Sequence, residues 1–162
     1  MAKTALLFSL ADALVNAFAI NDRINAYLLG SLPAEAWRAK PTGGKGRDAA
    51  AIPAHMHNVR VMWLKAAVRG SKIPGQLEKS KVTVKQAIAA LGESHDALAA
   101  VLKDAFASDG RIKSFKPDAA AFFGYLIAHD AHHRGQIAQL ARQVGYPLPQ
   151  KAMFGMWEWG TR

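Results

Sequence analysis

Apolar residues recur every three or four positions along four stretches of the chain, which is the periodicity of amphipathic α-helices. The first stretch spans Lys3 to Leu29 and is ended by the sequence Gly30-Ser31-Leu32-Pro33. The second is expected to begin near Asp48 and to stop before Gly70, with Pro53 in its first turn, where proline is tolerated. Its apolar stripe comprises Ile52, His55, Val59, Met62 and Ala66.

The third and fourth stretches show the same periodicity. The stripe of the third comprises Val84, Ile88, Leu91, His95, Leu98 and Leu102. The fourth stretch runs from Pro117 to Val144 and is closed by Gly145, a residue type that commonly ends helices. The stripe of the fourth comprises Phe122, Leu126, His129, His133, Ile137 and Leu140. The tail is expected to cap the helices with its large apolar residues, which are Met153, Phe154, Met156, Trp157 and Trp159.

The order of these segments predicts the architecture. No segment alternates apolar and polar residues as a half-buried strand would, and abundant alanine favours helix. The connection between the first two helices is long, and the later connections are expected to be short. We therefore predict an all-α protein, a four-helix bundle with a long crossover connection, formed by a single domain over residues 1–162.

The N-terminal apolar stretch is too interrupted to be a signal peptide or a membrane span. Polar residues break it before a membrane-length run appears, namely Asp12, Asn16, Asn21, Asp22 and Arg23. The chain is therefore expected to be soluble and cytoplasmic, without a membrane partner.

The net charge of +9 raises the question of nucleic-acid binding. The basic residues gather mainly in two groups, Arg38, Lys40, Lys45 and Arg47 and then Lys72, Lys79, Lys81 and Lys85. Neither group interleaves with aromatic residues or forms a basic recognition helix, which argues against a nucleic-acid partner. Solvated loops are the preferred interpretation, and a phosphate- or anion-binding surface is the alternative.

Candidate chemistry lies with the histidines, because the chain has no cysteine and any metal must be held by histidines and carboxylates. His129 and His133 stand one helical turn apart on one face, a spacing that lets two imidazoles chelate one ion. They also fall on the apolar stripe, where a metal would satisfy both rings at once. The alternative is a pair of core histidines bonded to neighbours. His132 lies off the stripe and is expected at the rim of the site.

A third ligand could come from His55 or His57 on the second helix or from His95 on the third. His55 belongs to the predicted stripe of its helix, whereas His57 is rotated about 200° away at 3.6 residues per turn. The phase therefore favours His55. His95 also lies in a stripe and stays an alternative ligand, although a structural role is preferred for it.

Other polar residues near the histidines receive structural interpretations. Asp130 and Arg134, one turn apart, are expected to pair on the outer side of the fourth helix. Gln136 could hydrogen-bond near the site, and Asn58 is similarly placed one turn from His55. The tryptophan pair of the tail is interpreted as core rather than as a platform for substrate.

Two sequence elements around these histidines form a recognisable pattern. The first reads Ala54-His55-Met56-His57-Asn58-Val59-Arg60, followed by Trp63-Leu64, and the second reads His129-Asp130-Ala131-His132-His133-Arg134-Gly135-Gln136-Ile137. With the tail Trp157-Glu158-Trp159-Gly160, they resemble the DinB/YfiT-like superfamily of metal-binding four-helix-bundle proteins. The resemblance spans all four predicted helices.

The resemblance implies a metal site made of one histidine from the second helix and two from the fourth, which are His55, His129 and His133. It implies zinc, nickel or another divalent ion with open positions for water or substrate. Members of this superfamily often form homodimers. Those with known activities include transferases that conjugate low-molecular-weight thiols and an isomerase that depends on such a thiol.

Three neutral imidazoles would leave the ion its full charge, so a metal-bound water or thiol could lose its proton near neutral pH and act as the nucleophile. Because the chain lacks cysteine, a nucleophilic thiol would have to arrive with a cosubstrate. We therefore expect a metal-dependent hydrolase or thiol transferase that acts on a small molecule. The alternative is a non-catalytic metal- or ligand-binding protein of a stress response.

Overall fold

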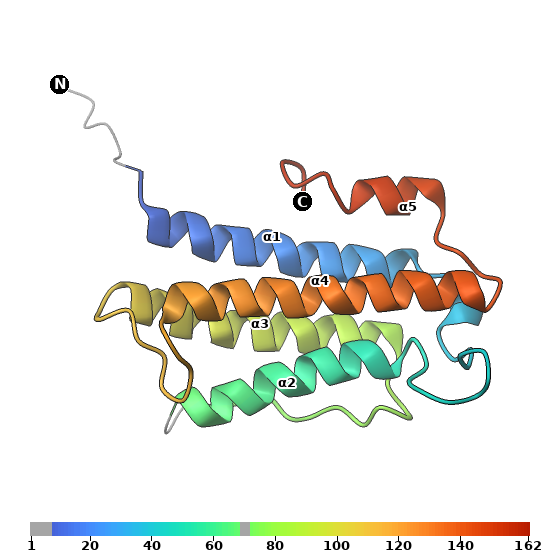
Figure 1. The fold of residues 1–162 in the computed structure, drawn as a ribbon, viewed down its shortest axis with the longest axis horizontal. Helices are drawn as coiled ribbons and strands as arrows, with labels where there is room; N and C mark the ends of the chain where they lie inside the picture. The colour runs from blue at the N-terminus through green and yellow to red at the C-terminus, as the bar shows by residue number, and fades with distance from the viewer. Residues whose placement is uncertain (1–7, 69–71) are drawn as a thin grey trace.

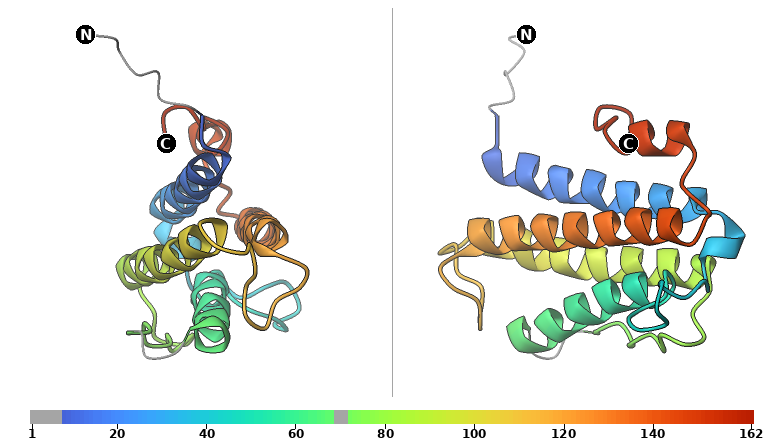
Figure 2. Two further views of the ribbon diagram at one scale, coloured as in Figure 1. Left: turned by 90° about the vertical axis from the view of Figure 1, so that its left-hand side faces the viewer. Right: turned by 45° about the vertical axis from the view of Figure 1, so that its right-hand side comes forward.

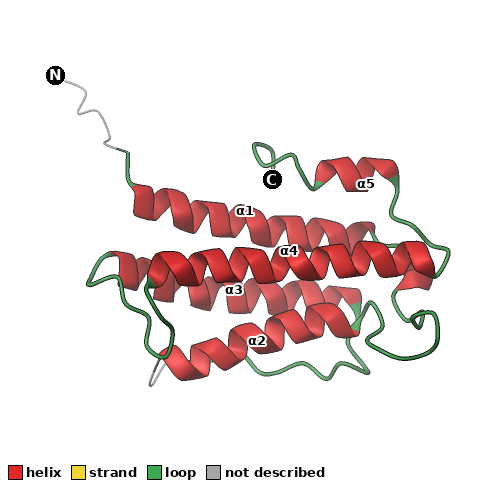
Figure 3. Cartoon of the chain, viewed as in Figure 1, coloured by secondary structure: helices red, strands yellow, loops and turns green. Residues whose placement is uncertain are grey.

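The structure, a computed structural model, describes residues 8–68 and 72–162. Regular structure within these ranges consists of helices, as the sequence predicted. The helices are α1 (Leu10–Ser31), the short 3-10 helix η1 (Ala34–Ala36), α2 (Ala51–Ala67), α3 (Val84–Phe106), α4 (Ala119–Gln143) and α5 (Gln150–Gly155). Figure 3 shows the same elements by type of structure. None of the helices in the described ranges has the length and apolar character needed to cross a membrane.

The four long helices pack side by side as a bundle (Figure 1). α1 and α4 run in one direction, and α2 and α3 run in the other. α3 and α4 each contact both α1 and α2, so α1 and α2 occupy opposite corners, as the view along the bundle shows (Figure 2). This arrangement brings the first half of α2, which carries His55, beside the middle of α4, which carries His129 and His133.

The helix boundaries follow from side-chain caps. α1 begins at Leu10 because the Ser9 hydroxyl accepts a hydrogen bond from the Asp12 amide. The sequence placed the start of this helix at Lys3, which is wrong for residues 8 and 9, because they are not helical. Lys3 itself lies outside the described residues. α3 begins with a capping box formed by Thr83 and Gln86. α4 begins two residues after Pro117 because the Asp118 side chain accepts from the Ala121 amide.

Two of the connections between the long helices are long, which corrects the expectation of short later connections. Residues 32–50 link α1 to α2, and buried Trp37 anchors them by donating its indole N–H to the Val82 carbonyl at 3.0 Å. The connection after α2, described from residue 72, returns along the bundle because α2 and α3 run in the same direction. The side chain of Asn58 holds this connection against α2, because it donates to the Leu77 carbonyl at 3.0 Å and accepts from the Leu77 amide at 2.8 Å.

The core consists of two apolar clusters separated by a polar layer. One cluster gathers around Leu28, Met56 and Ile137, and the other around Phe18 and Leu102. Between them along the helices lie the buried polar residues of the described chain, which are Asn21, Asn25, His57, Arg60, Ser94, Asp130 and His133. Each of the four long helices therefore contributes polar side chains to the middle of the bundle.

An ion pair between Arg60 of α2 and Asp130 of α4 is the centre of this layer. Both side chains are almost wholly buried, and the Arg60 guanidinium donates to Asp130 at 2.7 Å and to Asp22 of α1 at 2.7 Å. The amides of Asn21 and Asn25 donate to the same Asp130 oxygen at 2.6 and 2.8 Å. The layer thus joins α1, α2 and α4 through one carboxylate.

The predicted outward pair of Asp130 and Arg134 is wrong. Asp130 points into the bundle, where Arg60 and the two asparagine amides satisfy it. Arg134 is half-buried and donates to the side-chain oxygens of Asn21 and Asn25, at 2.7 Å each. Each asparagine therefore bridges the two charges, because its amide N–H donates to Asp130 and its amide oxygen accepts from Arg134.

The predicted stripe of α2 is partly wrong in phase. Met62 is 49% exposed although the stripe placed it in the core, and Arg60, which was not part of the predicted stripe, is 1% exposed. His57, expected to face elsewhere, is fully buried. The buried face of α2 thus follows His57, Arg60 and Leu64, because ion partners on other helices make an arginine acceptable in the core.

The C-terminal tail covers the bundle less completely than predicted. Gly155 of α5 is buried against the ring of Tyr27 on α1, where a side chain would collide with that ring. Trp157, expected in the core, is 78% exposed, and Phe154 is 64% exposed. α5 therefore packs through its small residues and presents large apolar side chains to solvent.

We expect Arg60→Met to lower the free energy of unfolding by about 3–5 kcal/mol, because it leaves the buried Asp130 carboxylate without its ionic partner. The measurement is urea unfolding at pH 7. Lys65→Met, at an exposed position of the same helix, is the matched control and should change stability by no more than about 0.5 kcal/mol. A loss in Arg60→Met equal to that of the control would contradict the assigned role.

Candidate metal centre

Three histidines from two helices meet at one place on the bundle. His55 comes from α2, and His129 and His133 come from α4. One ring nitrogen from each lies within 4.8 Å of the chosen nitrogens of the other two. The structure therefore brings together the three residues favoured from the sequence, in a geometry that could hold a metal ion.

The α4 pair is arranged as a chelate. The Nε2 atoms of His129 and His133 are 3.2 Å apart, because residues four positions apart lie on the same face of a helix. Two nitrogens bound to one tetrahedral zinc at about 2.1 Å would lie roughly 3.4 Å apart. The observed spacing fits one divalent ion shared by the two rings.

A chain of hydrogen bonds fixes the orientation of His133. Its Nδ1 lies 2.7 Å from the Gln136 side-chain oxygen, which can only accept, so Nδ1 carries the proton and Nε2 presents a lone pair. The Gln136 amide in turn donates to Nε2 of His132 at 2.9 Å. The expected positions of Gln136 near the site and of exposed His132 at its rim are both confirmed.

His129 lies between the buried ion pair and an aromatic ring. Its Nδ1 is 3.9 Å from an Asp130 oxygen, too long for a hydrogen bond but close enough for the carboxylate charge to act on the ring. Tyr125, one turn earlier, stacks on the same ring with centroids 5.8 Å apart. Asp130, the next residue after His129, thus connects the candidate site to the buried ion pair of the core.

Burial and positive charge favour the neutral form of His55 and His133. Partial burial, then the positive charge of Arg47 and the neighbouring histidines, lowers the pKa of His55 to about 4. Burial also lowers the pKa of His133, against the opposing effect of its bond to Gln136. Neutral rings are the form that binds metals, so the apo site is prepared for an ion at neutral pH.

The two alternative ligands lie elsewhere. Nε2 of His57 is 2.7 Å from the Gly75 carbonyl and must donate to it, while Nδ1 is 3.1 Å from the Ser94 hydroxyl. His95 packs against Phe18 in a tilted arrangement, with ring centroids 4.7 Å apart, and its Nδ1 contacts Asp96 at 3.0 Å. Both rings therefore serve the packing of α3 against α1 and α2.

The sequence interpretation missed the residues that surround the histidines. Asp130 was assigned to the surface, and Arg47 was assigned only to a basic loop. The available signal for Asp130 was Asn21, a polar residue on the apolar stripe of α1, since a buried polar residue requires a polar partner. No signal in the sequence placed Arg47 near the histidines, because it lies on an irregular connection.

Comparison with known proteins agrees with this geometry. The family model described as the DinB family matches residues 1–159. No curated protein and no solved structure matches the chain. Because the match extends over nearly all of a helical bundle with the expected histidine cluster, the chain belongs to the DinB family.

Proposed function

We propose that this protein is a metal-dependent enzyme of the cytoplasm, either a hydrolase or a transferase that uses a low-molecular-weight thiol, acting on a small molecule. The observation that carries the proposal is the convergence of His55, His129 and His133 within 4.8 Å. His55 and His129 are only partly buried, so a substrate could reach the cluster from solvent. Family membership supports the same proposal.

The donor set suits a divalent ion such as zinc or nickel, because neutral imidazole nitrogens are common ligands of both. When bound, such an ion would supply the positive charge that lowers the pKa of a water or thiol and polarises a substrate oxygen. The chain supplies no cysteine, so a transferred thiol would enter with a cosubstrate. The residues of the protein hold the site, keep the rings neutral and orient His133 through Gln136.

We expect the purified protein to contain about one divalent ion per chain and His55→Ala and His133→Ala to lose it, since each removes one of three ligands. The measurement is elemental analysis, with circular dichroism to verify that each variant is folded. His132→Ala, one residue from His133 and exposed, and His95→Ala are matched controls that should retain the ion. A wild-type protein that takes up no zinc or nickel on titration would contradict the proposal.

The stability of the metal-free protein should depend on pH through His55. A histidine in the unfolded chain binds a proton near pH 6.5, whereas His55 in the folded chain stays neutral down to about pH 4. The unfolded state therefore binds more protons between these values, and stability falls as pH is lowered through this window. We expect urea unfolding at pH 7 and pH 5 to show a larger loss for wild type than for His55→Gln. Equal losses would contradict this assignment.

We also propose that the protein is a homodimer. A groove of about 380 Å³ between α4 and α5 is lined mainly by apolar side chains, among them Ile127, Met153 and Trp157. Trp157 and nearby Phe154 are strongly exposed, and large exposed apolar surfaces commonly mark interaction sites. Pairing through this face would cover them.

Sedimentation velocity should give about twice the 17.5 kDa mass of one chain for the wild type. Trp157→Glu should shift the protein toward monomer, because it places a charge in the proposed contact. Lys151→Glu, at an exposed position of α5, introduces the same side chain and should leave the assembly unchanged. A wild-type protein that is monomeric at every concentration would overturn the homodimer.

A further inference from the structure

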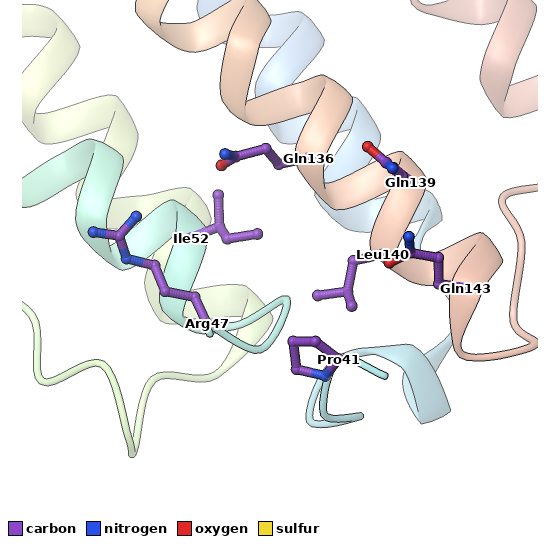
Figure 4. A pocket seen from close by; sticks show the side chains of 7 residues that line it. All are labelled: Pro41, Arg47, Ile52, Gln136, Gln139, Leu140 and Gln143. Carbon is purple, nitrogen blue, oxygen red and sulfur yellow. The ribbon is translucent and has the colours of Figure 1, made fainter. Parts of the chain in front are cut away.

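A pocket adjoins the metal centre where the crossover connection meets α2 and α4. Its volume is about 260 Å³, and its lining comprises Pro41, Arg47, Ile52, Gln136, Gln139, Leu140 and Gln143 (Figure 4). Arg47 rises beside the start of α2, and the three glutamines project from the facing α4. The pocket thus combines one cation, three amides and an apolar wall, and no carboxylate lines it.

The pocket and the metal centre share one residue. The side-chain oxygen of Gln136 accepts the hydrogen bond from Nδ1 of His133, and Gln136 also lines the pocket. One molecule could therefore place one end in the pocket and the other at the histidines. The shared residue therefore places the pocket beside the histidine cluster.

The positive charge of Arg47 has no compensating partner in the part of the chain that the structure describes. Arg47 is exposed and makes no ion pair or side-chain hydrogen bond there. The adjacent carboxylate of Asp48 is occupied, since it accepts from the Ala51 amide at 2.7 Å and lies 3.7 Å from Arg38. Arg47 is therefore a cation of the pocket wall that is available to a bound anion.

We propose that this pocket binds the anionic end of the substrate, a carboxylate or phosphate group, while the reactive end lies at the histidine cluster. Arg47 provides the charge on one side of the pocket, where the amide of Gln136 is the nearest hydrogen-bond donor from α4, and Gln139 and Gln143 line the far side (Figure 4). Ile52 and Leu140 contact the carbon skeleton. The inference rests on the proposed function and adds that the substrate is a small acidic molecule.

The volume of the pocket separates this inference from polymer binding. A space of about 260 Å³ accommodates a group of several heavy atoms rather than a stretch of backbone. The other basic residue of the same connection, Lys45, does not line it. The feature is therefore one exposed cation at the wall of a small pocket, and the excess of positive charge over the whole chain plays no part in the inference.

The test is a titration of the zinc-loaded protein, labelled with ¹⁵N, at low ionic strength. Succinate and inorganic phosphate are the two anionic probes, and succinamide is the neutral probe of similar size. We expect the anions to shift the side-chain amide signals of Gln136, Gln139 and Gln143, and the tighter of the two to identify carboxylate or phosphate as the preferred group. Succinamide should bind at least about tenfold more weakly, because it lacks the charge that Arg47 recognises.

Arg47→Gln should weaken binding of the preferred anion about tenfold and retain its zinc, because Arg47 is not a ligand. Lys45→Gln removes the same charge from the same loop outside the pocket and should bind the anion as the wild type does. Equal anion binding by wild type and Arg47→Gln would overturn the inference, as would equal binding of succinamide and succinate.

The same titration on metal-free protein separates this inference from the proposed function. Anion binding that depends on Arg47 in the absence of metal supports the proposed anion-binding pocket. It does so even if the protein takes up no zinc and the proposed metal-dependent function is contradicted. Anion binding that disappears with the metal but is insensitive to Arg47→Gln would show that the anion is only a ligand of the ion, and would overturn the pocket. His133→Ala, which should lack zinc, provides a second metal-free sample.

Discussion

The buried ion pair between Arg60 and Asp130 is the contact on which the candidate site depends. Removing two charges from water costs several kcal/mol for each, so such a pair is tolerated only when its geometry is good and its remaining hydrogen-bonding groups are satisfied. Here Asp22 and the Leu91 carbonyl also accept from Arg60, and Asn21 and Asn25 donate to Asp130. Among the described residues, only the buried Nε of Arg60 in this pair has no hydrogen-bond partner. Burial alone would raise the pKa of Asp130, but Arg60 and the hydrogen bonds outweigh it and hold that pKa well below its usual range.

The ion pair also relates the two helices that carry the histidines. Arg60 follows His55 by little more than one turn of α2, and Asp130 is adjacent to His129 on α4. A slip of either helix by one turn would separate the two charges and move His55 away from His129 and His133 together. We infer that the unfavourable desolvation of the pair is retained because apolar packing alone would leave this register weakly defined.

The sequence predicted the features that depend on local spacing. It failed where the burial of a side chain depends on a partner that is distant in the sequence. The four helices and the pair His129 and His133 follow from periodicity, because spacing along a helix determines which side chains share a face. His55 was selected on a stripe whose phase was partly wrong, since Met62 lies toward solvent and Arg60 lies in the core. A charged residue is assigned to the surface unless its partner is known, and Asp130 is distant in sequence from its partner Arg60.

Electrostatics explains why this site suits an anionic ligand. The histidine cluster offers three neutral nitrogens and no carboxylate ligand, so a divalent ion there would keep its full charge. Arg47 and Lys79 add positive charge around His55, and the buried carboxylate of Asp130 is already paired with Arg60. Proton binding to the rings is opposed by the same charges that would attract an anion. Burial and one positive environment therefore favour neutral His55 and anion recognition together, and the irregular connections before and after α2 supply the positive charge.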